Sequence, residues 1–509
     1  MHSEQRNIKS KFKKSLRLCV SAVILSVFAA NLFAQIEQPP APSAPRAAKI
    51  PPVQSKKLPN ELTIATVERK NVPLVTVSLL IRSGAAVENK DGLANMTAEL
   101  LTKGTRMRTA TQIAEQMEFL GGNLMTSANW NATVVSVNVA SDKLEQALAI
   151  MSDVVLHPMF APKEIALYKS QTIDDLNVAL KQPSSLANAI ASRYTFDEHN
   201  AIGTPESLSE INLADIAGFY KQSYIPSDAV LVFAGDINNN KAQILAQKYF
   251  GLWNTPKKNS DGINSAIGGD INRENSVVKR ILVVDLPNAG QASVVYSKRL
   301  KNLRRMRQDY FSQAMVSNTI LGGGYSARLN QEIRIKRGLS YGAGSSIGWR
   351  AYDANFSTRT QTKNVSAAEV AELVATEIDK LGSNVAEASE LMARKLTLTG
   401  DFGRDLETTD GLAERLIELF TFELNPQELN FYTTDIQKVS AEQVKEFASE
   451  RFLGGDIIIV GDAKIFMDDL KKRFPNQQIE IIAASDLDLN REDLRKVKSP
   501  AVKPKAKGK

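Results

Sequence analysis

The pattern of apolar residues across about residues 60–485 occurs in two similar copies. In each copy a helical stretch leads through a short turn into a β-branched strand that ends in Gly-Asp, at 235–236 and again at 461–462. Each copy also opens with an apolar strand, Leu74–Ile81 in the first and Ala292–Tyr296 in the second. This repetition predicts an α+β fold of two homologous α/β-roll halves, each a mixed or antiparallel sheet covered by helices.

The N-terminus has the pattern of a secretory signal peptide. Basic residues precede the uncharged apolar run Leu18–Ala30, and small residues follow around Ala34. We therefore expect residues 1–34 to direct export and to be cleaved, which places the mature protein in a bacterial periplasm. An uncleaved N-terminal membrane anchor is the alternative. The single cysteine, Cys19, lies in this segment, so the exported chain needs no oxidative folding.

Polar stretches mark the boundaries of the two halves. Residues 35–58 are rich in proline and predict a disordered spacer, and residues 256–275 are rich in Gly and Asn, as linkers are. The basic tail at 490–509 is also expected to be disordered. These segments delimit an N-terminal domain at 59–255 and a C-terminal domain at 276–489.

The net charge of +7 is concentrated at the two ends of the chain. Residues 1–34 carry six Lys or Arg and one Glu, and the last fifteen residues carry seven and no acid, so residues 35–494 have a net charge of −5. A mildly acidic folded region argues against a nucleic-acid partner. Membrane contact is expected only through the N-terminal segment or the basic tail.

The mature chain has too few histidines for a zinc site of its own. His2 lies in the signal segment, which leaves His157, His199 and no cysteine. His157 precedes Pro158 in a turn, and His199 opens a polar loop. We interpret both histidines as structural.

Three long motifs lie in collinear order along the two halves. They are SGAAVENKDGLANMTAELLTKGT from Ser83, HNAIGTPESLSEINLADIAGFYKQSYIPSDAVLVFAGD from His199, and LGGGYSARLNQEIRIKRGLSYGAGSS from Leu321. Together they resemble the pitrilysin/insulinase-type zinc peptidases, the inverzincins, over about residues 58–470. The resemblance implies a clam-like monomer that acts on peptides.

That family binds zinc through H-x-x-E-H on a helix, where two histidines share one face and the Glu acts as general base. The matching positions here hold Asn95, Ala98 and Glu99, so an amide, an alanine and a carboxylate replace the ligand, the base and the second ligand. The family's third, acidic ligand falls near Asp175, with Asp174 beside it. The resemblance therefore implies a degenerate zinc site.

Could Glu99 and Asp175 hold another ion? Two carboxylates and an amide suit Ca²⁺ or Mg²⁺ better than Zn²⁺, and without a base at position 98 no hydrolytic machinery remains. We expect no metal in this chain, and zinc in a partner subunit.

The second half retains a further family motif. In IRIKRGLSY, Arg334 and Tyr341 match the Arg/Tyr pair that the family uses on substrate. Ala327–Arg337 has a helical pattern, Gly338 is a natural residue to end it, and a strand follows, so the two side chains are expected to face one cleft. Arginine offers donors to peptide carbonyls, and a tyrosine hydroxyl can stabilise an oxyanion. The alternative is a solvated Arg and a half-buried Tyr.

Members of the family can divide the work between one chain with H-x-x-E-H and one with the Arg/Tyr pair. The sequence resembles the second kind, so we expect an exported pseudo-peptidase subunit of a heteromeric zinc peptidase, in a heterodimer or larger assembly. Arg334 and Tyr341 would act in trans on short or unfolded peptides. A structural or peptide-binding paralogue with no catalytic partner is the alternative. Asn95 and Ala98 argue against peptidase activity of the chain alone.

Overall fold

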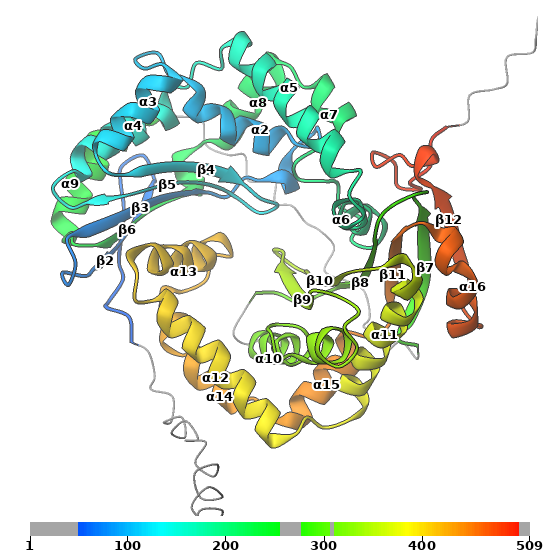
Figure 1. The fold of residues 1–509 in the computed structure, drawn as a ribbon. Helices are drawn as coiled ribbons and strands as arrows, with labels where there is room; N and C mark the ends of the chain where they lie inside the picture. The colour runs from blue at the N-terminus through cyan, green and yellow to red at the C-terminus, as the bar shows by residue number, and fades with distance from the viewer. Residues whose placement is uncertain (1–48, 255–275, 306–309, 498–509) are drawn as a thin grey trace, which may run out of the picture. The chain divides into compact units, whose positions relative to one another are not determined.

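The computed structural model describes residues 49–254, 276–305 and 310–497, and within them the chain forms two six-stranded sheets (Figure 1). The first sheet has the order β1 (Gln54–Lys57), β2 (Thr63–Glu68), β6 (Ala229–Gly235), β3 (Leu74–Ile81), β5 (Thr133–Ala140) and β4 (Asn123–Ala128). The second has the order β12 (Ile479–Ala483), β7 (Val278–Asp285), β11 (Gly455–Gly461), β8 (Ala292–Leu300), β10 (Ala354–Thr362) and β9 (Ala343–Trp349).

Helices surround both sheets. Those of the first half are α2 (Leu93–Leu100), α3 (Ala110–Phe119), α4 (Leu144–Leu156), α5 (Pro162–Ala179), α6 (Pro183–Tyr194), α7 (Pro205–Glu210), α8 (Leu213–Ser223) and α9 (Asn239–Phe250). Those of the second half are α10 (Phe311–Leu321), α11 (Ala367–Ser383), α12 (Ala388–Asp405), α13 (Thr409–Thr421), α14 (Tyr432–Lys438), α15 (Ala441–Arg451) and α16 (Ala463–Arg473). Capping boxes on Asn212 and Ser440 begin α8 and α15, the two helices that precede β6 and β11.

The strand pairing confirms the predicted two-half α+β fold. β2 runs parallel to β6, as β7 does to β11. The next strand in each sheet runs antiparallel to its neighbour, β3 to β6 and β8 to β11. Both sheets end in three antiparallel strands, in the order β3-β5-β4 in the first and β8-β10-β9 in the second. The repeated Gly-Asp pairs lie at the ends of the equivalent strands β6 and β11.

The halves differ at one sheet edge. β1 pairs antiparallel with β2, whereas β12 pairs parallel with β7. β1 lies inside the segment 35–58 that was expected to be a disordered spacer, and its polar, exposed residues suit an edge strand. Within the expected tail, Leu494 is buried and Arg495 forms a β-bridge with Leu487, so ordered structure extends to these residues.

The predicted signal peptide at 1–34 and linker at 256–275 lie outside the described residues, as do the spacer before residue 49 and the tail after 497. Within the described ranges, no helix has both the length and the apolar character needed to cross a membrane.

Each sheet is covered on one face by helices of its own half and on the other by a helix of the opposite half. In β3, Val77 and Leu79 join the apolar cluster under α4 and α9, whereas Leu80 joins the cluster formed with α13. In β8, Val294 faces the helices of the second half, whereas Val295 packs under α6 of the first half (Figure 1). Because successive strand residues point to opposite faces, both faces of each sheet are buried.

Polar contacts fix the N-terminal end of α13 on the first sheet. Asp410 accepts a hydrogen bond from the Thr76 hydroxyl of β3 at 2.6 Å and from the Asn138 amide of β5 at 2.8 Å. A carboxylate in the first turn of a helix also interacts favourably with the helix dipole. The packing of α13 on the first sheet thus combines apolar burial with directional hydrogen bonds.

We expect Ile190→Ala to destabilise the protein by about 2–5 kcal/mol, because Ile190 is fully buried between α6 and the second sheet. Ile244→Ala deletes the same atoms from α9, where Ile244 is 67% exposed, and should cost less than about 0.5 kcal/mol. Urea unfolding followed by circular dichroism measures both. Equal midpoints for the two variants would show that α6 does not hold the halves together.

Candidate functional site

The degenerate zinc motif lies on α2, which keeps its buried face. Leu93, Met96 and Ala98 are in the core, and α2 packs on α8 and α5. The Asn95 side-chain oxygen accepts a hydrogen bond from the Tyr168 hydroxyl of α5 at 3.1 Å. Burial raises the pKa of Glu99, and nearby Lys103 partly opposes this shift.

Asp174 and Asp175, near which the third ligand was expected, lie on α5, the helix that packs against α2. Both are exposed on α5, whereas the residue of α5 that contacts Asn95 is Tyr168. Sequence reasoning missed Tyr168, although its position about two helical turns before Asp175 was a usable signal.

The residues at this position do not fit zinc. Structural and catalytic zinc sites use mainly imidazole and thiolate ligands in tetrahedral geometry, whereas Asn95 offers an amide oxygen already bound by Tyr168. Both remaining histidines are engaged elsewhere, His157 with Asp153 at 3.4 Å and His199 with Glu88 at 2.8 Å. Over the ranges that the structure describes, no group of three or more His, Cys, Asp or Glu side chains could hold a metal ion.

His199 instead supports the start of α2. Glu88, whose side chain is fully buried, accepts hydrogen bonds from the backbone amides of Gly92 at 2.8 Å and Ala94 at 2.6 Å and pairs with His199. Burial disfavours the charged imidazole, but the hydrogen bond to Glu88 and the nearby Asp91 carboxylate outweigh it and raise the pKa of His199. For the Glu88 carboxyl, burial raises the pKa, and its hydrogen bonds to His199, Ala94 and Gly92 oppose the shift.

The same loop contacts the second half of the chain. The ring of Trp130 lies 4.9 Å from that of His199, and the guanidinium of Arg350 lies 5.3 Å from the Trp130 ring. Arg350, which follows β9, also makes a bidentate ion pair with Glu198 at 2.7 and 2.6 Å. The region around His199 is therefore structural, as the sequence predicted.

Arg334 lies on a short π-helix, η4 (Asn330–Ile335), within the predicted helical segment. Gly338 follows in the left-handed region at φ 64°, which confirms its predicted role at the helix end. The Asn330 side chain donates to the backbone oxygen of Tyr325 and accepts from the Ala343 amide at 3.3 Å, so it joins the helix to β9. The guanidinium of Arg334 lies 4.9 Å from the centre of the Tyr325 ring.

Arg334 lines a cavity of about 570 Å³, whereas Tyr341 lies beside it. The cavity walls include the glycine run Gly322–Gly324, strand residues of β9 and β10, and Ser184 and Asn188 of α6. Tyr341 is 91% exposed and does not line this cavity, although its neighbour Gly342 does. The structure therefore places Arg334 at the cavity and leaves the Tyr341 ring in solvent.

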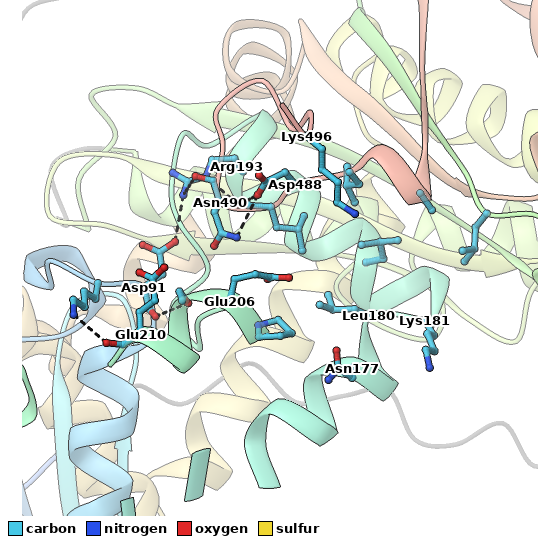
Figure 2. Close-up of a pocket in the computed structure, with 18 of the residues that line it drawn as sticks. Asp91, Asn177, Leu180, Lys181, Arg193, Glu206, Glu210, Asp488, Asn490 and Lys496 are labelled. Carbon is cyan, nitrogen blue, oxygen red and sulfur yellow. Dashed lines mark hydrogen bonds and ion pairs between the residues drawn. The ribbon is translucent and has the colours of Figure 1, made fainter. Parts of the chain in front are cut away.

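A larger cavity, of about 740 Å³, lies between the loop before α2, helix α7 and the C-terminal segment (Figure 2). Two of its basic lining residues are ion-paired. Arg193 contacts Asp91 at 3.3 Å, and Lys90 contacts Asp215 at 2.7 Å. Arg193 also donates to the backbone oxygen of Leu489, so this cavity marks where the C-terminal segment is attached to the first half.

Two family models match the chain. Residues 63–203 match the model described as insulinase (peptidase family M16), and residues 210–395 match the model of the peptidase M16 inactive domain. The chain belongs to the insulinase family, M16. Arg334 and Tyr341 lie within the part that matches the inactive domain, and Asn95, Ala98, Glu99 and Asp175 lie within the other match.

Similar proteins agree with this assignment. An uncharacterized zinc protease of Rickettsia bellii is 28% identical over 295 residues, which are 57% of this chain and 68% of that protein. The structure of a peptidase M16 inactive domain from Pseudomonas fluorescens has a TM-score of 0.72 at 22% identity, over 80% of this chain and 98% of that one. The periplasmic protease PqqL from Escherichia coli has a TM-score of 0.65 at 15% identity, over 86% and 52%. The two structural similarities show the shared fold.

For this insulinase-family protein we expect a pH-dependent contribution of His199 to stability. Its pKa is raised above the value of 6.5 that it has when unfolded, so its stabilisation is full below about pH 6.5 and is lost as the pH rises through the folded value. His199→Gln keeps a donor for Glu88 but does not titrate. The stability of the wild type relative to this variant should fall between pH 6 and pH 8.

Urea midpoints measured across that pH range test the prediction, and parallel profiles would contradict it. His199→Ala is the companion variant, because it leaves Glu88 buried without this partner. It should cost about 2 kcal/mol at pH 6.

Proposed function

We propose that this protein is an exported, non-catalytic subunit of a heteromeric insulinase-type peptidase. It would bind short or unfolded peptides and present Arg334 and Tyr341 to a partner that carries H-x-x-E-H and zinc. The observation that carries the proposal is a contrast within one chain. Asn95, Ala98 and Glu99 replace the zinc motif, whereas the Arg/Tyr pair is intact.

The geometry around Arg334 and Tyr341 suits a role in trans. Arg334 lines a cavity, where its planar group of donors can hold peptide carbonyls. The Tyr341 hydroxyl makes no hydrogen bond to any residue that the structure describes, and the side chain is 91% exposed, so a second chain or its substrate can reach it. A buried or already bonded hydroxyl would not serve this purpose.

A partner's zinc and its Glu would supply the activation of water. The residues of this chain would bind and orient the peptide, and the Tyr341 hydroxyl would donate a hydrogen bond to the scissile carbonyl oxygen as negative charge develops on it. Export rests on the signal-peptide pattern at 1–34, and the structural neighbour PqqL is described as periplasmic.

A structural or peptide-binding protein without a catalytic partner is the second candidate. The cavity beside Arg334 favours it equally, since peptide binding alone requires no zinc motif in any chain. The two candidates differ in whether peptide hydrolysis appears on mixing with an H-x-x-E-H protein, such as one encoded beside this gene.

We expect the purified chain to contain far less than stoichiometric zinc and to leave peptides uncut. The reason is that no imidazole or general base stands at positions 95, 98 and 99. Elemental analysis after dialysis and a peptide-cleavage assay with and without chelator measure both. Stoichiometric zinc together with chelator-sensitive cleavage would overturn the pseudo-enzyme assignment.

In the mixture with its partner, Tyr341→Phe should lower turnover by about 10²–10³-fold with little change in peptide affinity, because the hydroxyl acts on the transition state. Arg334→Ala should weaken peptide binding by about tenfold or more, through loss of hydrogen bonds from a charged group. The partner's zinc content should not change in either mixture.

Tyr352→Phe and Arg106→Ala are the matched controls, because both residues lie outside the cavity. They should leave the kinetics of the mixture unaltered. Wild-type kinetics in mixtures that contain Tyr341→Phe or Arg334→Ala would rule out the role in trans and favour the second candidate.

A further inference from the structure

We propose that the cavity beside Arg334 binds the carboxylate group of a peptide, and that Arg359 is the second cationic residue of this site. The inference rests on the proposed function and names its substrate class, namely peptides that present a carboxylate. Arg359 lies on β10, outside every motif that the sequence singled out.

The charge of the cavity lining is one-sided. Among the described residues that line it, Arg334 and Arg359 are charged, and none is Asp or Glu. The other lining residues are uncharged. The larger cavity in Figure 2 differs, since acidic and basic groups both line it. An uncompensated positive charge in a concave site attracts anions.

Neither arginine is neutralised by the protein. Within the part of the chain that the structure describes, neither the Arg334 nor the Arg359 guanidinium has a hydrogen-bond or ion-pair partner, and that of Arg334 lies over the Tyr325 ring. Arg328, which lies just before η4, makes a bidentate pair with Glu390 at 3.0 and 2.7 Å. Two guanidinium groups therefore remain available on one cavity, and a carboxylate is the group whose geometry a guanidinium matches best.

The sheet geometry directs Arg359 towards the cavity. It alternates with buried Thr358 and Thr360, so its side chain leaves the opposite face of β10 from theirs. Its partner across the ladder is Gly344 of β9, which has no side chain to fill the space. Ser184 and Asn188, one helical turn apart on α6, line the same cavity from the first half.

The site has room for the end or the side chain of a peptide. Its volume of about 570 Å³ lies within the range usual for ligand pockets. A Cβ atom added at Gly324 or Gly342 would meet no atom within 4 Å, so the backbone there borders open space. Arg334 alone could donate hydrogen bonds to a neutral peptide carbonyl. Two arginines on one cavity suit a ligand group with a full negative charge, such as a carboxylate.

The carboxylate could come from the C-terminus of the peptide or from an Asp or Glu side chain. Three labelled decapeptides of otherwise identical sequence separate these sources. One has a Glu and an amidated end, one has Gln and a free end, and one has Gln and an amidated end. Fluorescence anisotropy with the full exported chain alone, at low ionic strength, gives the dissociation constants.

We expect at least one carboxylate peptide to bind about tenfold more tightly than the neutral one, and the one that does so identifies the source. Arg359→Gln should reduce this preference to near unity. Arg106→Gln removes the same charge from an exposed position outside the cavity and should keep the preference. Arg359→Glu should reverse it, so that a Lys-containing amidated peptide binds better than its Glu counterpart.

Equal affinity for all three peptides, or no measurable binding of any, would overturn the site. So would an equal loss of preference in Arg106→Gln and Arg359→Gln, because the effect would then be one of net charge. The outcome is separate from that of the proposed function. Activity on mixing with a partner can appear without a carboxylate preference, and the preference can appear without a partner.

Discussion

Burial of both faces of each sheet is the constraint on which the rest of the structure depends. The strand Leu74–Ile81 is apolar at six of its eight positions and buried at every position after the first, so both of its faces are covered. Helices of the same half cover one face of each sheet. A helix of the opposite half covers the other face, α13 on the first sheet and α6 on the second. Separation of the halves would expose α6, α13 and the apolar sheet surface that each covers, which would destabilise both halves.

The chemistry of the chain can change without disturbing this packing. On α2 the core residues Leu93 and Met96 hold the helix in place, whereas Asn95 and Glu99 are half-buried and do not belong to the apolar cluster. Replacement of metal ligands at such positions removes the site and keeps the helix. The bond between Asn95 and Tyr168 then satisfies a polar group that would otherwise be left between α2 and α5.

The features that repeat along the chain were predictable, and those that depend on one particular contact were not. The Gly-Asp pairs and flanking strands predicted the duplicated fold, and the pattern around Gly338 predicted the helix end. That α6 packs on the second sheet and α13 on the first was not predictable, because an apolar helical face does not specify which sheet it covers. Arg359 was missed for a similar reason. A single arginine in a strand does not indicate a site in the sequence, and only the structure shows the cavity beside it.

The packing of α6 on the second sheet also gives the first half a role in the cavity. α6 covers Val295 and Ile458 of the second sheet, and from the same helix Ser184 and Asn188 line the cavity beside Arg334. A second half alone would lose this wall and expose the apolar surface beneath it. The cavity therefore requires the first half as a scaffold, whether or not that half carries a metal. Absence of the H-x-x-E-H residues and retention of the complete two-half fold are thus physically compatible in one chain.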